Sequence, residues 1–289
     1  MRNAARALAA AWLLTAAGCA TTAALDRRWI EVHSANFSIY TALDEASARQ
    51  MLEDRELFRA AILAVTKVRR VVPHVPTEIY AFVSNYEPFR PGSNIAGYFH
   101  PTLRTNLVAI DARPGKQRIL ARAILYREYT HFLLHNEGRA AYPLWFDEGF
   151  AQMLSSVDVL GAMVRIGVVP AHRVDRVRHA PKLPYSRILH AQSFTGWSQA
   201  EIGSFYAQAW LLVHNLTLGQ LGNFGDLLDR YLAEVGRGID EDVAFHSAFG
   251  IDVDDLRSRL LAYQKEIPSF GLPRGELAKG LAIEVRAAR

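Results

Sequence analysis

No glycine or proline interrupts the chain between Lys116 and Asn136, and apolar residues recur throughout this stretch. An uninterrupted apolar pattern of this kind predicts a buried α-helix. The centre of the stretch reads Arg-Glu-Tyr-Thr-His and begins at Arg127. Residues four apart share one face of a helix, so Arg127 and His131 should project together with Glu128 beside them. A fold built around this helix has to accommodate charged side chains on one of its faces.

A second motif follows the first at short distance. It reads Leu-Trp-Phe-Asp-Glu-Gly-Phe-Ala, runs from 144 to 151 and contains Glu148. We expect it to form a second helix that ends near Ser156. The first motif has the spacing of H-E-x-x-H, in which two histidines hold zinc and the glutamate is the general base for the metal-bound water. In this chain Arg127 stands where the first histidine would be.

Together the two motifs resemble the gluzincin zinc peptidases, which share the core of thermolysin and aminopeptidase N, and especially the peptidase-MA-like families. The resemblance covers roughly Trp29 to Tyr263 and depends on the order of the motifs. It implies that Glu128 is catalytic and that His131 and Glu148 are zinc ligands.

The resemblance extends to the segment Phe205-Tyr206-Ala207-Gln208-Ala209-Trp210. It suggests that the Tyr206 hydroxyl stabilises an oxyanion, and a core tyrosine with a satisfied hydroxyl is the equal alternative. Trp145 and Phe146 are expected to be core residues next to the metal-ligand position Glu148.

Arginine changes the chemistry that the resemblance implies. A catalytic zinc keeps three protein ligands and a water, and an arginine side chain is always protonated and has no lone pair to donate. The positive charge of Arg127 also repels a dication. Without a cation, Glu128 and Glu148 would repel one another, and a guanidinium can bridge them with charge-assisted hydrogen bonds. Our hypothesis is that Arg127 replaces the metal as the electrostatic centre of the site.

Two further residues belong to the candidate site. His135 lies one turn beyond His131, at a spacing suited to two metal ligands. A shifted metal site made of Glu128, His131 and His135 is one interpretation, and a helix-end histidine favoured by the helix dipole is the preferred one. Asp147, where related proteins often carry asparagine, either orients a ligand or is an acid favoured near a helix start.

The N-terminus has the features of an export signal. Arg2 and Arg6 precede an apolar run from Ala7 to Ala17, which is too short to span a bilayer as a helix. The ending Ala-Ala-Gly-Cys at Cys19 resembles a bacterial lipobox, and Cys19 is the only cysteine of the chain. We therefore expect residues 1–19 to be a lipoprotein signal peptide with lipid attached to Cys19, and an ordinary secretory signal is the alternative.

The remaining pattern predicts both strands and helices. Alternating apolar and polar residues predict strands near 29–32, 37–40, 78–83, 97–100, 106–110 and 163–169. Apolar residues at helical spacing predict helices near 51–65, 205–216, 221–235, 240–249 and 254–263. The stretch from 171 to 193 is basic, with Arg173, Arg176 and Arg178. It is expected to be a solvated loop, and a substrate-guiding role for its arginines is the alternative.

These elements predict an α+β fold of the thermolysin and aminopeptidase type. Residues 26–112 should form an N-terminal β-rich lobe with a mixed or antiparallel sheet, and residues 113–267 a helical lobe that carries the motif helix. Residues 268–289 have no clear partner and are expected to be a loosely held tail.

Charge limits the kinds of partner. The formal net charge is +4, and it falls to +2 without Arg2 and Arg6, so no basic stripe for nucleic acid is expected. We expect a bacterial cell-envelope protein, lipid-anchored in the outer membrane or periplasm, whose peptidase activity is impaired. It should bind a peptide or protein in a groove beside the motif helix by strand addition, with no cofactor. The alternatives are an active zinc metallopeptidase with altered coordination and a purely structural envelope protein.

Overall fold

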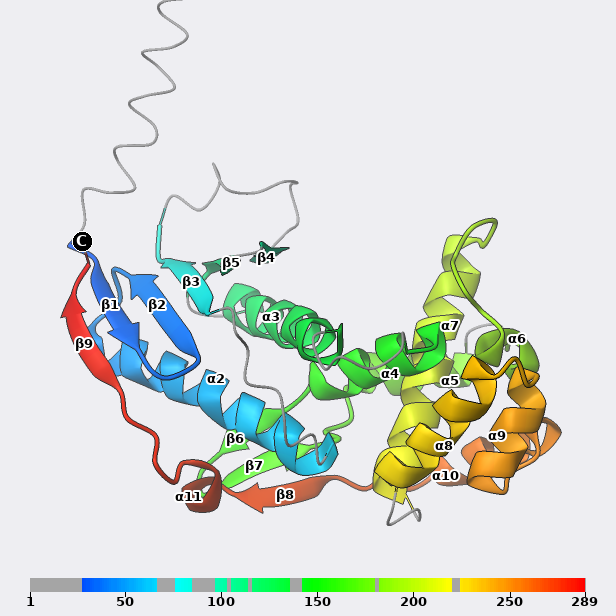
Figure 1. Cartoon of the computed structure of the whole chain (residues 1–289). Helices are drawn as coiled ribbons and strands as arrows, with labels where there is room; N and C mark the ends of the chain where they lie inside the picture. The colour runs from blue at the N-terminus through cyan, green and yellow to red at the C-terminus, as the bar shows by residue number, and fades with distance from the viewer. Residues whose placement is uncertain are drawn as a thin grey trace, which may run out of the picture. The chain divides into compact units, whose positions relative to one another are not determined.

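A computed structural model of the chain describes residues 28–66, 76–84, 97–102, 105–113, 116–135, 142–179, 182–219 and 224–288 (Figure 1). In these residues the chain is a mixed α+β protein, as its sequence predicts. The expected signal peptide and Cys19 lie outside the described residues. Among the helices that are described, none is at once long enough and apolar enough to cross a membrane.

The chain divides into two compact units. The first contains Met1–Glu56, His74–Leu125 and Gly280–Arg289, and the second contains Leu57–Pro73 and Tyr126–Lys279. Two helices contribute to both units, namely α2 (Glu45–Thr66) and α3 (Lys116–His135). The whole Arg-Glu-Tyr-Thr-His motif therefore belongs to the second unit.

The first unit contains a mixed six-stranded sheet in the order β4-β5-β3-β2-β1-β9. Its strands are β1 (Ile30–His33), β2 (Phe37–Thr41), β3 (Thr77–Phe82), β4 (Gly97–Pro101), β5 (Asn106–Asp111) and β9 (Glu284–Ala287). Strands β2, β3 and β5 are parallel, and the other pairs are antiparallel. Ile39, Ile79 and Val108 stand in register across the parallel strands and are buried, so one face of the sheet is core. Figure 1 shows the first part of α2 running along β1 and β2.

The second unit is centred on the packing of α4 (Leu144–Leu154) against α7 (Gln199–His214). Trp145 and Phe146 of α4 are buried, which confirms them as core residues. The Trp145 ring N–H donates to the Tyr231 hydroxyl at 3.3 Å, and this hydroxyl donates to Glu241 at 2.8 Å. One face of the helix formed by the second motif therefore packs in the core, and the other face carries residues of the candidate site.

The later helices follow the predicted order. They are α8 (Phe224–Gly236), α9 (Glu241–Phe249) and α10 (Leu256–Tyr263), while α7 continues into a π-helical turn at Asn215–Gly219. Asp240 caps the start of α9 by accepting two backbone N–H bonds, and Gly250 ends it at φ 66°. Both residues have the positions that helix start and stop signals predict.

Two expectations were wrong. The basic stretch expected to be a solvated loop contains helices α5 (Ala171–His179) and α6 (Tyr185–Leu189). The C-terminal segment expected to be a loose tail contributes β8 (Phe270–Pro273), a short helix α11 (Arg274–Leu277) and β9. β8 joins β6 (Asp158–Leu160) and β7 (Met163–Ile166) in a three-stranded antiparallel sheet. Both segments gain their order from distant partners.

Candidate functional site

Helix α3 separates its apolar and polar side chains. Tyr126, Tyr129 and Leu133 are buried, and they recur at the three- and four-residue spacing of one helix face. Tyr126 stacks on Phe58 of α2 with ring centroids 3.7 Å apart. This burial fixes the rotation of α3, so Arg127 and His131 of the Arg-Glu-Tyr-Thr-His motif face α4.

Helix α4 supplies the acidic residues of the site, and a glycine sets its distance from α7. A Cβ at Gly149 would lie only 2.6 Å from the carbonyl oxygen of Ala209. The two helices therefore approach more closely than any other residue at this position would allow. Because Glu148 immediately precedes Gly149, this close approach helps to fix the carboxylate beside α3. The glycine of the Trp-Phe-Asp-Glu-Gly motif thus has a packing role.

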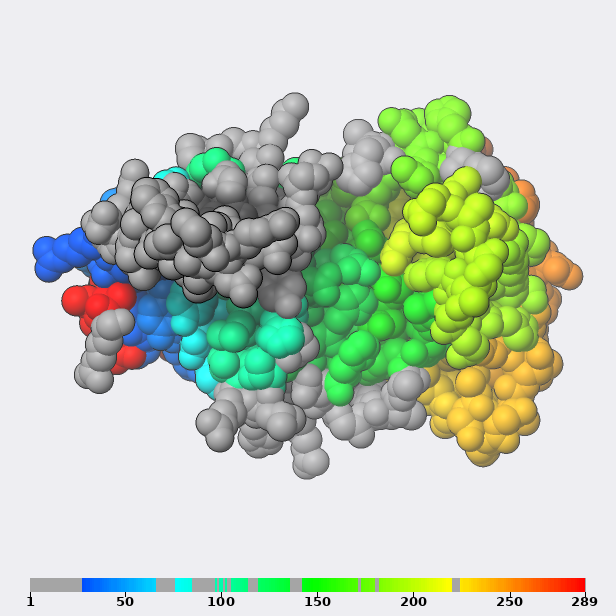
Figure 2. Space-filling model, turned by 90° about the horizontal axis from the view of Figure 1, so that it is seen from above, coloured from blue at the N-terminus to red at the C-terminus, as the bar shows by residue number. Residues whose placement is uncertain are grey.

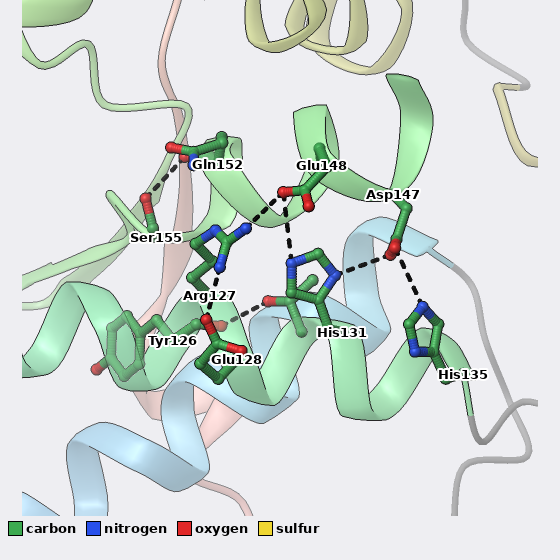
Figure 3. Close-up of polar contacts among 10 residues, drawn as sticks. Tyr126, Arg127, Glu128, His131, His135, Asp147, Glu148, Gln152 and Ser155 are labelled. Carbon is green, nitrogen blue, oxygen red and sulfur yellow. Dashed lines mark hydrogen bonds and ion pairs between the residues drawn. The ribbon is translucent and has the colours of Figure 1, made fainter. Parts of the chain in front are cut away.

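Arg127 bridges the two carboxylates of the site (Figure 3). Its Nη1 donates to Glu128 Oε1 at 2.6 Å, and its Nη2 donates to Glu148 Oε2 at 2.6 Å. The exposed fractions of the side chains are 26% for Arg127, 33% for Glu128 and 13% for Glu148. Burial acts to lower the pKa of Arg127, but the charges of Glu148 and Glu128 outweigh it and raise this pKa above its ordinary value. The guanidinium is firmly charged and occupied on two sides.

The histidines of α3 are joined through Asp147. His131 Nδ1 lies 2.9 Å from Asp147 Oδ1, and His135 Nε2 lies 3.1 Å from Asp147 Oδ2 (Figure 3). Burial acts to raise the pKa of Asp147, but its hydrogen bond and charge interaction with His131, and those with His135, hold this pKa below the ordinary value. The other ring nitrogen of His131, Nε2, is 3.7 Å from Glu148 Oε2. His131 therefore lies between the two acidic residues of α4.

Tyr206 of α7 lies beside the bridge. The guanidinium carbon of Arg127 is 5.9 Å from the centre of the Tyr206 ring, which is half-buried and packs on Phe194. Burial and the charge of Glu148 raise the pKa of the Tyr206 hydroxyl, and Arg127 acts against them. The structure thus brings Tyr206 to the other predicted site residues, while its role with an oxyanion stays a prediction.

Arg173 joins the predicted site residues, although the sequence favoured a solvated loop for it and gave a substrate-guiding role as the alternative. It lies on α5, is only partly exposed, and its buried Nε has no hydrogen-bond partner. Burial, together with the positive charges of Arg127 and Arg176, lowers the pKa of Arg173 to about 10. The sequence contains a signal for α5, because Pro170 precedes an apolar pair, Val174 and Val177, at helical spacing. The surrounding arginines make the apolar pattern weak, so the helix was not predicted.

The donor set does not fit the zinc site that the resemblance implies. Of the three ligand positions, only His131 and Glu148 carry groups that can bind a metal, and the Arg127 guanidinium is bonded to Glu148. A different group meets the spacing for a metal ion, because ligand atoms of His131, His135 and Asp147 lie within 4.8 Å of one another. This group differs from the shifted site considered from the sequence, since Asp147 takes the place of Glu128.

The Arg127 bridge is partly exposed to solvent. In the space-filling view of Figure 2, green atoms of α4 reach the surface next to yellow-green atoms of α7. The partial exposure of Arg127 and Glu128 agrees with this view. A ligand from solution can therefore reach the edge of the bridge.

In comparisons with known proteins, the chain matches no protein-family model, and no curated protein is significantly similar to it.

Proposed function

We propose that this protein is a gluzincin-like protein of the bacterial cell envelope that binds peptides and has lost most or all of its peptidase activity. The observation that carries the proposal is the Arg127 bridge, which occupies Glu128 and Glu148 with hydrogen bonds of 2.6 Å each. These are the carboxylates to which the resemblance gives the roles of general base and metal ligand. The motif order of the sequence supports the relationship to gluzincins.

The chemistry of the bridge argues against peptide hydrolysis. A general base has to offer a carboxylate lone pair to water, and Glu128 Oε1 instead accepts a hydrogen bond from a permanent cation. A water molecule at neutral pH also has to be activated, which three metal ligands and a dication would achieve. Changes one shell further from a metal already cost about 10–100-fold in affinity or activity. Replacing a ligand by a cation should cost more.

Peptide binding is supported by the sheet of the first unit. β4 stands at the end of the strand order, and in the described part of the chain β5 is its only neighbour. A Cβ at Gly97 of β4 would lie 3.6 Å from a methyl group of Ile124, so this strand packs along the first part of α3. An edge strand can add an extended peptide through its main-chain groups. The proposed envelope location and lipid anchor depend on the N-terminal sequence that ends in Cys19.

The proposal is tested by zinc titration of three proteins. Calorimetry should detect no tight zinc site in the wild type and a new one, with one ion per chain, in Arg127→His. Arg127→Gln is the matched control, because it removes the repelling charge without supplying an imidazole. The wild type with zinc should leave a mixed peptide library uncut. Tight zinc binding by the wild type together with chelator-sensitive cleavage would overturn the proposal.

A second candidate function follows from the group formed by His131, His135 and Asp147. Two imidazoles and a carboxylate are suitable ligands for a transition-metal ion, so this group supports a metal-dependent enzyme with altered coordination. His135→Ala distinguishes the two candidates, because His135 belongs to this group and makes no contact with Arg127. Metal binding and activity that both disappear in His135→Ala would favour the second candidate.

A further inference from the structure

Among the described residues, Arg173 has no counter-ion. In the part of the chain that the structure describes, no carboxylate forms an ion pair with its guanidinium, and its buried Nε has no hydrogen-bond partner. Leaving a partly buried charge unpaired is costly, because water that would solvate it has been removed. An arginine in this state favours the binding of an anion that the described residues do not supply.

Arg176 and Gly203 place this cation next to the candidate site. Arg176 lies three residues after Arg173 on α5, so the two share a helix face. The guanidinium of Arg176 occupies the space above Gly203 of α7, where a Cβ would overlap it. Tyr206, one turn further along α7, contacts Arg127. One face of α7 therefore meets arginines from both α5 and α3.

The acidic groups of the candidate site, and Glu201 of α7, are already occupied. Glu128 and Glu148 are both bonded to Arg127. On α7, Glu201 accepts a hydrogen bond from Arg187 at 2.7 Å and completes the helix cap with Ser198. Asp147 is held by two histidines. Arg173 and Arg176 thus leave an excess of positive charge beside the bridge.

We infer that Arg173 and Arg176 form a receptor for a carboxylate group of the bound peptide. Gly203 leaves the space in which the Arg176 guanidinium of this receptor lies. Guanidinium groups suit this role because they bind carboxylates in a planar, often bidentate, arrangement. The inference deepens the proposed function and rests on it, since the carboxylate would belong to the peptide. The source of the carboxylate is either an acidic side chain or a free C-terminus.

The first experiment tests the receptor without a peptide. Thermal unfolding of the full chain is followed in sodium acetate and in sodium chloride at equal ionic strength. Acetate should raise the unfolding midpoint of the wild type more than chloride does, because a ligand that binds the folded state stabilises it. This difference should disappear in Arg173→Met and shrink in Gly203→Ala, in which every charge is retained. Arg178→Met removes a charge from an exposed position of the same helix and should keep the difference.

The second experiment measures the binding of labelled peptides by fluorescence anisotropy. Three amide-capped or free peptides of one sequence are compared, carrying an internal glutamate, a glutamine in its place, or a glutamine and a free C-terminal carboxylate. One of the two carboxylate peptides should bind the wild type about tenfold more tightly than the neutral peptide, the magnitude of a charged hydrogen bond. Arg173→Met should lose this preference, and Gly203→Ala should reduce it.

The outcomes separate the inference from the proposed function. Peptide binding that ignores the carboxylate overturns the inference and leaves the peptide-binding function in place. An acetate effect that is equal in the wild type and Arg173→Met also overturns it. An acetate effect that depends on Arg173, without binding of any peptide, overturns the proposed function instead.

Discussion

Replacing Arg127 by alanine removes the donor that Glu128 and Glu148 share. Breaking a buried ion pair from one side costs about 3–5 kcal/mol, and pairs on the surface contribute about 0–1 kcal/mol. Glu148 is 13% exposed and Glu128 is 33% exposed, so the two bonds belong to different parts of this range. We assign about 2 kcal/mol to the Glu148 bond and less than about 1 kcal/mol to the Glu128 bond. Arg127→Ala should therefore lower the free energy of unfolding by about 2–3 kcal/mol at pH 7.

The assay is urea unfolding followed by circular dichroism, with a control matched in distance. Lys279 Nζ lies 2.6 Å from Glu276 Oε2, the same separation as in the bridge, but these side chains are 71% and 64% exposed. Lys279→Ala should cost less than about 0.5 kcal/mol. Adding Glu148→Gln to Arg127→Ala should recover part of the loss, because the amide carries no charge that needs a partner.

The reasoning makes burial, and not the short distance, the source of the stability of the bridge. If Arg127→Ala unfolds within about 0.5 kcal/mol of the wild type, the bridge contributes no more than a surface pair. If Lys279→Ala lowers the free energy of unfolding by as much as Arg127→Ala does, burial does not influence the stability that an ion pair contributes. Either result refutes the argument, and with it the idea that Arg127 stands in for a metal as the electrostatic centre.

Three further predictions concern the surroundings of the bridge. Gly149→Ala should lower the free energy of unfolding by about 1–3 kcal/mol in urea, because its Cβ would meet the Ala209 carbonyl oxygen at 2.6 Å; an unchanged value would mean that the helices separate freely. Arg173→Met should raise the thermal midpoint, corresponding to about 1 kcal/mol, since an unpaired cation is removed, and a lower midpoint would reveal a missed partner. Burial acts to raise the pKa of Asp147, but its bonds with His131 and His135 hold this pKa below the unfolded value of about 3.9. The ionised carboxylate therefore stabilises the fold above that pH, and this stabilisation is lost as the pH falls through the folded pKa. Asp147→Asn should therefore be less stable than the wild type at pH 7 in urea unfolding, with a difference that shrinks below about pH 4; a constant difference would contradict this.

The elements that sequence could predict are those whose signals are local. Helix α3 has an uninterrupted apolar pattern, and α9 has Asp240 before it and Gly250 after it. Strand β9 has no such signal, because its order depends on pairing with β1, which lies at the other end of the sequence. Helix α5 was missed because its arginines outnumber the apolar residues that pack against the core. Local patterns record propensity, and tertiary pairing decides the rest.

Some contacts of the candidate site could likewise be predicted from local sequence, and others depend on tertiary packing. The hydrogen bond between Arg127 and Glu128 follows from neighbouring positions on one helix, and the role of Glu148 follows from motif order. The link from Asp147 to both histidines depends on how α4 is oriented beside α3, which neighbouring positions in the sequence do not determine. That Arg173 has no counter-ion among the described residues could not be predicted, because it depends on how distant segments pack around α5.

Strand β9 has a consequence for the route by which the fold forms. Ile30 is opposite Ala287 in the pairing of β1 with β9, so the six-stranded sheet is completed only when the chain closes a loop that includes most of the protein. The entropic cost of closing a loop grows slowly with its length, but contacts between distant residues slow folding strongly. Until that closure, β1 is a bare sheet edge, open to pairing with another chain. The pairing of β1 with β9 therefore protects the folding chain from pairing with other chains, as well as stabilising the folded protein.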